Sequence, residues 1–273
     1  MEGELRIALA VCRSVVGDTK GNLERMDQWC ASAKANGTAL VCFPELSATG
    51  YHVRDEIRWA AEAIAGPCSG QISDMADRHG ISILAGIAEK HGSRIYASHV
   101  VAEPGSGITG LYRKLHLGHP EKKIFTHGIH PPCLFETRGL KFGLQLCYDA
   151  HFPELSTTMA MDGADIIFIP HASPGTSGDD KLDSWMRHLP ARAFDNGVYV
   201  AAVNPVGGNG CGLWFPGAAV VISPDGKIIN HFAGEDETML IADLSAKTLE
   251  SVRSHPMKYF LPDRRPEVYK IQR

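Results

Sequence analysis

Two apolar runs of the chain end at side chains that can take part in acyl transfer. In VCFPEL (residues 41–46) the side chain is Glu45, a carboxylate at the rim of a core. Partial desolvation there raises a carboxyl pKa toward that of a general base. In GLQLCYD (residues 143–149) it is Cys147, which precedes a turn and a helix start near Pro153. Backbone N–H groups at a helix start favour a thiolate, so Cys147 is a candidate nucleophile.

A cation completes the candidate chemistry. Lys114 lies in GLYRKLHL (residues 110–117), between an apolar strand and a histidine-rich loop, where its ammonium can point inward. Taken singly, each of the three side chains has a commoner structural explanation: a strand-end carboxylate, a buried thiol or a solvated lysine. Their combination is suited to attack on an amide-like carbon, with the ammonium holding the developing oxyanion.

Taken together, these segments resemble the motifs of the nitrilase superfamily, the carbon–nitrogen hydrolases. The three motifs stand as FPELSATGY (residues 43–51), LYRKLHL (residues 111–117) and LCYDAHFPELS (residues 146–156). Three later segments extend the resemblance: WMRHLPARAFDNGVYVAAVN (residues 185–204), FPGAAVVISPDGKII (residues 215–229) and DRRPEVY (residues 263–269). The second of these has Ala218 or Ala219 where the family more usually has a serine. The resemblance covers essentially the whole chain, in the family's order.

The resemblance implies an α/β fold, a four-layer α-β-β-α sandwich of the nitrilase type. It implies a catalytic triad of Glu45, Lys114 and Cys147. A second glutamate, which follows the lysine in the family, matches Glu121. It also implies a homodimer or higher homo-oligomer, since the family commonly pairs its subunits through helices.

The triad leads to a concrete mechanism. Cys147 gives its proton to Glu45 and attacks the carbonyl, while Lys114 and the backbone N–H of Tyr148 hold the oxyanion. Ammonia leaves, a thioester forms on Cys147, and a water activated by Glu45 releases the acid. We expect Glu121 to orient the substrate amide or that water, and no metal or organic cofactor to be needed.

Three further side chains are candidates for substrate contact. Tyr51 follows Glu45 closely in the family-like segment, and Tyr148 follows the nucleophile. His171 begins a loop after a buried strand, where facing the substrate and being a satisfied strand-end histidine are about equally expected. Tyr51, Tyr148 and His171 are the candidate substrate-binding residues.

The elements that must position these residues alternate strand and helix along one domain, residues 1–273. Strands are predicted at residues 5–12, 40–43, 81–89, 96–102, 110–114, 140–147, 166–169, 198–204 and 218–223. Helices are predicted at residues 22–36, 56–65, 71–79, 153–162 and 184–196. Site residues then lie at the carboxyl ends of strands, where open α/β folds place their sites.

A weak internal repeat relates two parts of the sequence. LRIALAVC (residues 5–12) aligns without gaps on LKFGLQLC (residues 140–147), and NGTALVCFPE (residues 36–45) aligns on DGADIIFIPH (residues 162–171). The alignment predicts two related βαβ halves whose sheets face each other. It also makes His171 the counterpart of Glu45.

Two rival kinds of site are disfavoured. His116, His119, His127 and His130 form a dense cluster, but glycines and a proline interrupt it and no HExxH pattern aligns metal ligands on one helix face. The glycine-rich stretch at residues 207–212 precedes Leu-Trp-Phe-Pro rather than a helix start, so it is a poor dinucleotide motif.

Composition limits the class of protein, its binding partners and its location. With 44% hydrophobic and 21% charged residues, the 273-residue chain is globular rather than disordered. A net charge of −4 gives no basis for binding nucleic acid or an anionic membrane. Seven scattered cysteines without a CxxC pair, and an N-terminal apolar run too short for a secretory signal, predict a cytoplasmic protein.

These observations predict a cysteine-dependent enzyme that cleaves a small linear amide to a carboxylic acid and ammonia. The alternatives, in descending order, are hydrolysis of an N-carbamoyl amine or N-carbamoyl amino acid, a true nitrilase, and a non-catalytic family member. The triad is common to the whole family and does not choose among these substrates.

Overall fold

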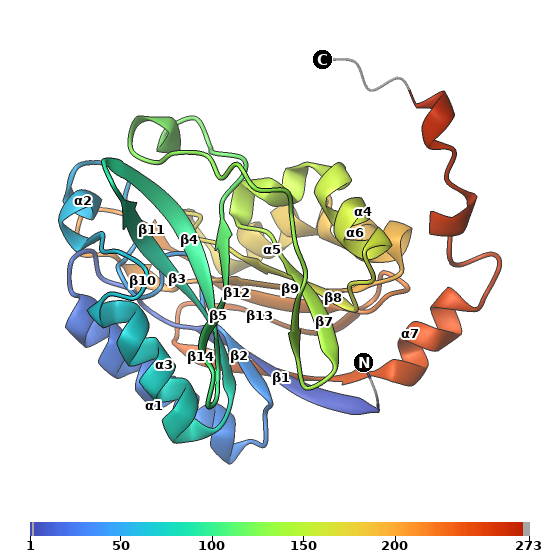
Figure 1. Ribbon diagram of the computed structural model, residues 1–273, viewed down its shortest axis with the longest axis horizontal. Helices are drawn as coiled ribbons and strands as arrows, with labels where there is room; N and C mark the ends of the chain where they lie inside the picture. Colours follow the sequence, from blue (N-terminus) through green and yellow to red (C-terminus); the bar gives the residue numbers. More distant parts are fainter. Residues whose placement is uncertain (2, 270–273) are drawn as a thin grey trace.

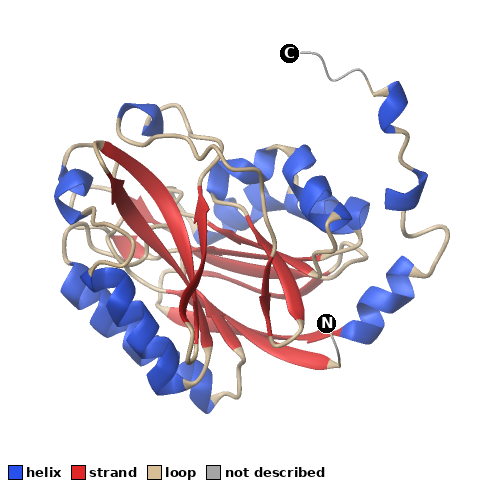
Figure 2. Ribbon diagram, viewed as in Figure 1, coloured by secondary structure: helices blue, strands red, loops and turns tan. Residues whose placement is uncertain are grey.

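A computed structural model describes residue 1 and residues 3–269 of the chain (Figure 1). Two six-stranded mixed sheets lie face to face, and helices cover their outer faces (Figure 2). The four layers confirm the predicted α-β-β-α sandwich.

The first sheet has its parallel strands in the middle. Strands β1, β2 and β3 are parallel, whereas β14, β4 and β5 pair antiparallel to their neighbours. The order across the sheet is β14 (Thr238–Ser245), β1 (Glu4–Val11), β2 (Leu40–Cys42), β3 (Ser82–His91), β4 (Arg94–Glu103) and β5 (Gly107–Arg113).

The second sheet repeats this plan. Strands β7, β8 and β9 are parallel, and β6, β12 and β13 are antiparallel to their neighbours. Its order is β13 (Ile228–Gly234), β12 (Gly217–Ile222), β9 (Tyr199–Asn204), β8 (Ile166–Pro170), β7 (Leu140–Leu144) and β6 (Phe135–Thr137). A short hairpin, β10 (Gly207–Gly208) with β11 (Trp214–Phe215), connects β9 to β12.

The equivalent strand orders confirm the internal repeat. β1 and β2 occupy the places in the first sheet that β7 and β8 occupy in the second, as the sequence alignment requires. Because parallel neighbours end at the same edge of a sheet, the loops that follow β7 and β8 emerge beside one another. A hydrogen bond from the Glu45 N–H to the His171 carbonyl joins the loop after β2 to the loop after β8.

The helices divide between the two outer faces. The first sheet is covered by α1 (Thr19–Ala35) and α3 (Pro67–His79), and the second by α4 (Pro153–Met161), α5 (Gly178–Met186) and α6 (Leu189–Asn196) (Figure 1). The remaining short elements are α2 (Glu56–Ala60), α7 (Ala246–Arg253) and the 3-10 helices η1 (Glu121–Lys123), η2 (Cys147–His151), η3 (Leu261–Asp263) and η4 (Pro266–Val268).

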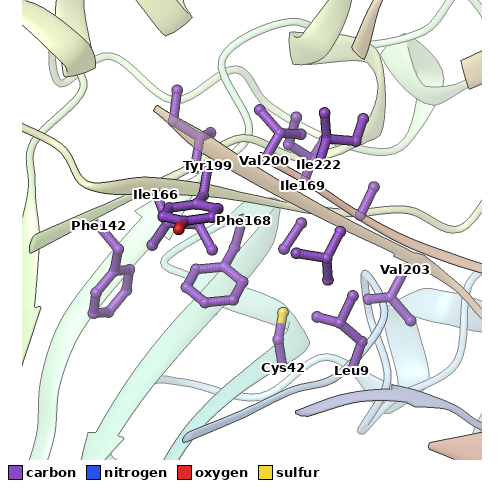
Figure 3. Packing of buried hydrophobic residues seen from close by; sticks show 14 of the residues in the cluster. Leu9, Cys42, Phe142, Ile166, Phe168, Ile169, Tyr199, Val200, Val203 and Ile222 are labelled. Atoms are coloured by element: carbon purple, nitrogen blue, oxygen red, sulfur yellow. The ribbon is translucent and has the colours of Figure 1, made fainter. Parts of the chain in front are cut away.

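Alternation along β1 builds two apolar layers. Ile7, Leu9 and Val11 face the second sheet, whereas Ala8 and Ala10 face the helices, since successive side chains of a strand point to opposite faces. Figure 3 shows the layer between the sheets, where Leu9 and Cys42 of the first sheet face Phe168 and Val203 of the second.

Several element boundaries differ from the sequence prediction. The strand predicted to run to Cys147 ends at Leu144, because the backbone turns into η2. The helix predicted at residues 184–196 is two helices, α5 and α6, and Pro190 stands in the first turn of α6, where a proline is tolerated. The helix predicted at residues 56–65 ends at Ala60.

No helix in the described part of the chain is both long enough and apolar enough to cross a bilayer.

Candidate active site

Glu45 stands on a tight turn directly after β2. Leu46 has a left-handed backbone (φ 55°), and its main chain crosses β3 at Gly86, where a Cβ would come within 2.0 Å of the Leu46 nitrogen. The Gly86 N–H donates to Ser47 Oγ (3.1 Å), and the Glu45 N–H donates to the His171 carbonyl (3.1 Å). The turn therefore needs a glycine at residue 86, and it joins the two repeat-related strand ends.

Lys114 bridges two glutamates at the end of β5. Its Nζ donates to Glu45 Oε1 (2.8 Å) and to Glu121 Oε1 (2.7 Å), and none of the three residues is more than 3% exposed. Burial by itself lowers the lysine pKa. The charges of Glu45, the Cys147 thiolate and Glu121 outweigh that effect and hold the pKa well above its ordinary value. The ammonium is therefore a permanent cation.

Glu121 begins η1 and is fixed by two further donors. The Gly118 N–H donates to its Oε2 (2.6 Å), and the Tyr51 hydroxyl donates to its Oε1 (3.1 Å). The structure thus brings the predicted residues Tyr51 and Glu121 next to Lys114. The Gly118 N–H and the Tyr51 hydroxyl therefore fix the carboxylate that holds the lysine in place.

Cys147 occupies a strained elbow at the start of η2. Its backbone is left-handed (φ 45°), a conformation that a non-glycine residue rarely adopts and that clusters at functional sites. The charges that act on its thiol come from Lys114, Glu45, Glu121 and Lys181. The nucleophile candidate therefore shares one site with the two glutamates and the buried lysine.

The resting form of Cys147 differs from the expectation. The sequence favoured a thiolate, but burial raises the pKa of the thiol to about 12, despite the opposing charge of Lys114. The carboxylates of Glu45 and Glu121 act in the same direction as burial. At neutral pH the proton is on sulfur, so attack requires a base.

Glu45 has the properties of that base. Burial raises the pKa of its carboxyl to about 7, with Lys114 opposing the shift and Glu121 adding to it. Its Oε1 accepts from Lys114, while its Oε2 is buried and has no hydrogen-bond partner within residues 3–269. Oε2 is therefore available to accept a proton.

Asp149 ties the lysine strand to the nucleophile elbow, and the sequence reasoning missed it. Its fully buried carboxylate accepts from the Tyr112 hydroxyl (2.8 Å), the Leu146 N–H (3.0 Å), the His116 N–H (2.7 Å) and His116 Nδ1 (2.9 Å). Tyr112 and His116 flank Lys114, and Leu146 precedes Cys147. A signal was present, since Asp149 belongs to the same LCYDAHFPELS motif.

The other two predicted contacts lie in different places. The Tyr148 side chain is 41% exposed and lines a surface hollow with His116, His127 and Phe152. His171 is 4% exposed, packs against Trp185 (ring centroids 4.6 Å apart), and has a buried Nε2 without a partner among the described residues. Burial, then the charge of Lys181, holds the His171 pKa well below its ordinary value, so the ring is neutral.

The rival motifs form structural features. His116 contacts Asp149, and His127 Nδ1 contacts the Leu115 carbonyl (2.9 Å). Across residues 3–269 no group of three or more histidine, cysteine or acidic side chains is arranged to hold a metal ion. The glycine-rich stretch is the turn of the β10–β11 hairpin, where Asn209 donates to the Tyr51 carbonyl (2.9 Å).

Comparisons with known proteins agree with this geometry. The model of the carbon–nitrogen hydrolase family matches residues 6–254. A nitrilase of Pyrococcus abyssi is 32% identical over 91% of this chain and 92% of its own. An N-carbamoylputrescine amidase of Solanum lycopersicum is 28% identical over 93% and 90%.

Solved structures of nitrilase-superfamily enzymes share this fold. A cysteine-to-alanine variant of an amidase from Nesterenkonia, of the nitrilase superfamily, superposes with a TM-score of 0.82, at 27% identity over 98% of this chain and 97% of its own. In a glutamate-to-glutamine variant of that amidase, the acetamide moiety of fluoroacetamide is bound covalently to the active-site cysteine.

Proposed function

Because the chain belongs to the carbon–nitrogen hydrolase family, we propose that it cleaves a small linear amide to a carboxylic acid and ammonia, with Cys147 as nucleophile. One observation supports this most directly. A buried ammonium is held between two buried carboxylates, beside a thiol that keeps its proton at rest.

The first half of the reaction forms a thioester. As the Cys147 sulfur attacks the amide carbon, its proton passes to the free oxygen of Glu45. The oxyanion forms between Lys114 Nζ and the Tyr148 N–H, which as one of the first groups of η2 has no partner within that helix. When the C–N bond breaks, Glu45 returns the proton to the leaving nitrogen. Ammonia departs, and the acyl group stays on sulfur.

The second half regenerates the thiol. Glu45 takes a proton from a water, the resulting hydroxide attacks the thioester carbon, and the C–S bond breaks. The acid leaves as the thiolate recovers its proton from Glu45. Glu121 keeps Lys114 in position throughout, so it is a positioning residue in this scheme.

The test is a Cys147→Ala variant. We expect it to fold and to release no ammonia from any amide, since the nucleophile is gone. Cys133→Ala is the matched control, because Cys133 is an exposed thiol that has no role in this scheme. Ammonia release by the Cys147→Ala protein would contradict the proposal.

N-Carbamoyl compounds are the second candidate substrates and nitriles the third, and the chain is similar both to an N-carbamoylputrescine amidase and to a nitrilase. Carbon dioxide release alongside ammonia would identify an N-carbamoyl substrate. Homo-oligomeric assembly and a cytoplasmic location stay predictions from the sequence.

A further inference from the structure

Within the part of the chain that the structure describes, a second lysine, in the helix after His171, has no anionic partner. Lys181, in α5, is half-buried, and its Nζ donates to Ser173 Oγ (2.6 Å). Among the described residues no carboxylate lies within 4.0 Å of its ammonium. The neighbouring Asp180 is exposed, and its carboxylate accepts from the Thr176 and Ser177 hydroxyls instead (both 2.7 Å).

The hydroxyl that holds this lysine is itself fixed. Asn204, fully buried at the end of β9, accepts from the Ser173 N–H (2.8 Å) and donates to the Ser173 carbonyl (3.1 Å) and the Pro216 carbonyl (2.9 Å). A rigid strand end therefore fixes the Ser173 backbone, and Ser173 holds the ammonium. The arrangement is preorganised rather than a solvated surface lysine.

Hydrogen bonds connect this lysine to the strand ends of the site: Lys181 donates to Ser173, in the loop that begins at His171. Ser173 follows His171 by two residues, and the His171 carbonyl accepts from the Glu45 N–H. The Lys181 charge acts on both Cys147 and His171. His171 Nε2, buried and without a partner in the described chain, is a second polar group in this region.

A partly desolvated ammonium without a counter-ion is costly, and an anionic ligand recovers that cost. Lys114 has no such need, because Glu45 and Glu121 already neutralise it. A cationic ligand in the same place would be repelled. The two lysines therefore differ in function: one is paired within the protein, and the other is open to a ligand.

We propose that Lys181 determines specificity by binding a carboxylate at the end of the substrate remote from the scissile amide, with His171 Nε2 as a second donor. The inference rests on the proposed function and narrows it to short amides or carbamoyl compounds that carry a carboxylate. It disfavours cationic carbamoyl amines.

The experiment compares ammonia release from five compounds of matched size. Glutaramate and succinamate are anionic amides, butyramide is a neutral amide, N-carbamoylglycine is an anionic carbamoyl compound, and N-carbamoylputrescine is a cationic one. We expect the wild-type protein to have its highest kcat/KM with an anionic compound. Comparison of glutaramate with N-carbamoylglycine then shows whether the preferred anionic substrate is an amide or a carbamoyl compound.

Variants assign the preference to Lys181. In Lys181→Met the ratio of kcat/KM for the preferred anion to that for butyramide should fall about 10- to 100-fold, the effect of one lost charge-assisted hydrogen bond. The decrease should come mainly from a higher KM for the anionic compound. Lys181→Arg should restore part of the ratio. Lys20→Met, which removes an equally charged but 88% exposed side chain, should leave the ratio unchanged.

Two results would overturn the inference: a wild-type preference for butyramide or N-carbamoylputrescine, or an equal loss for anionic and neutral amides in Lys181→Met. If no compound releases ammonia, the proposed function fails, and glutaramate binding to the Cys147→Ala protein tests Lys181 by itself. Calorimetry should then show weaker binding when Lys181→Met is added, and equal binding would count against the carboxylate site.

Discussion

At the scale of single residues, the site stores its reactive proton on the nucleophile. Burial gives Cys147 a pKa of about 12 and Glu45 a pKa of about 7, so near neutral pH sulfur keeps the proton. Because the thiolate is the reactive species, Cys147 must lose this proton before it can attack. Activation depends on Glu45 and on a substrate that brings its carbonyl to Lys114.

The pH dependence follows from Glu45. The base must be ionised to accept the thiol proton, so kcat/KM should rise as pH increases through about 7 and fall below it. Glu45→Gln should lower kcat by roughly 10²–10⁴ and remove this rise. Ammonia release measured from about two pH units below the Glu45 pKa to about two units above it checks the wild-type rise and its loss in Glu45→Gln. A flat wild-type profile across neutral pH would contradict the role of Glu45, and Glu136→Gln, at an exposed position, is the control.

Asp149 should matter for both stability and rate. Asn at this position offers one acceptor oxygen to four donors, so Asp149→Asn leaves buried donors unpaired and should lower the free energy of unfolding by about 1–3 kcal/mol. It should also lower kcat, because the Lys114 strand and the Cys147 elbow lose their shared anchor. Denaturant unfolding and ammonia release measure the two effects. Asp162→Asn, at an exposed helix end, should change neither.

At the scale of elements, three turns do the positioning. Glu45 precedes a left-handed Leu46, Cys147 is itself left-handed, and Lys114 leaves β5 with its N–H on the Ala97 carbonyl (2.9 Å). Glu45 and Cys147 follow the parallel strands β2 and β7, and Lys114 follows the antiparallel strand β5. The sequence predicted that these residues follow strands, but it did not predict where β7 ends or how the elbow turns.

The errors at the elements have physical causes. Apolar residues continue to Leu146, so periodicity extends β7 past Leu144, whereas the actual end is set by the Asp149 contacts with the Leu146 N–H. The elbow is also supported by Arg192 of α6, whose Nε donates to the Ala150 carbonyl (3.0 Å) in η2. Neither contact can be read from the apolar periodicity of the strand.

Gly86 gives a prediction at this scale. A Cβ there would lie 2.0 Å from the Leu46 nitrogen, so Gly86→Ala must displace the Glu45 turn. A shift of about 1 Å at a catalytic group can cost about 10²-fold in rate, and we expect a loss of at least that size in kcat/KM. Gly70→Ala, in α3 with nothing within 4 Å of the added Cβ, should retain activity and be slightly stabilising. A fully active Gly86→Ala enzyme would show that the turn tolerates movement.

At the scale of the whole molecule, the internal repeat explains where the site lies. The two sheets have equivalent strand orders, and the Glu45–His171 hydrogen bond joins equivalent positions of the two halves. The sequence predicted this symmetry from two short alignments. It did not predict that Lys181, in a helix without a counterpart in the aligned segments, is held by Ser173, two residues after His171.

Each half contributes different chemistry to the shared site. Glu45, Lys114 and Glu121 come from the first half, and Cys147, His171 and Lys181 come from the second. The connection between the halves passes through residues 129–133, where Ile129 is 74% exposed. Such exposed loops are the usual sites of proteolytic cleavage.

We therefore expect activity to survive a cut in the chain between the two halves. A protease recognition site placed in that loop and cut in the folded protein should give a nicked enzyme that still turns over, held together by the apolar layer between its sheets. Fragments purified apart in denaturant should each be inert, and renaturing them as a mixture should rescue turnover. With that outcome, the molecule would behave as an obligate heterodimer that is encoded as one polypeptide. A fragment that is active alone would instead show that one half suffices.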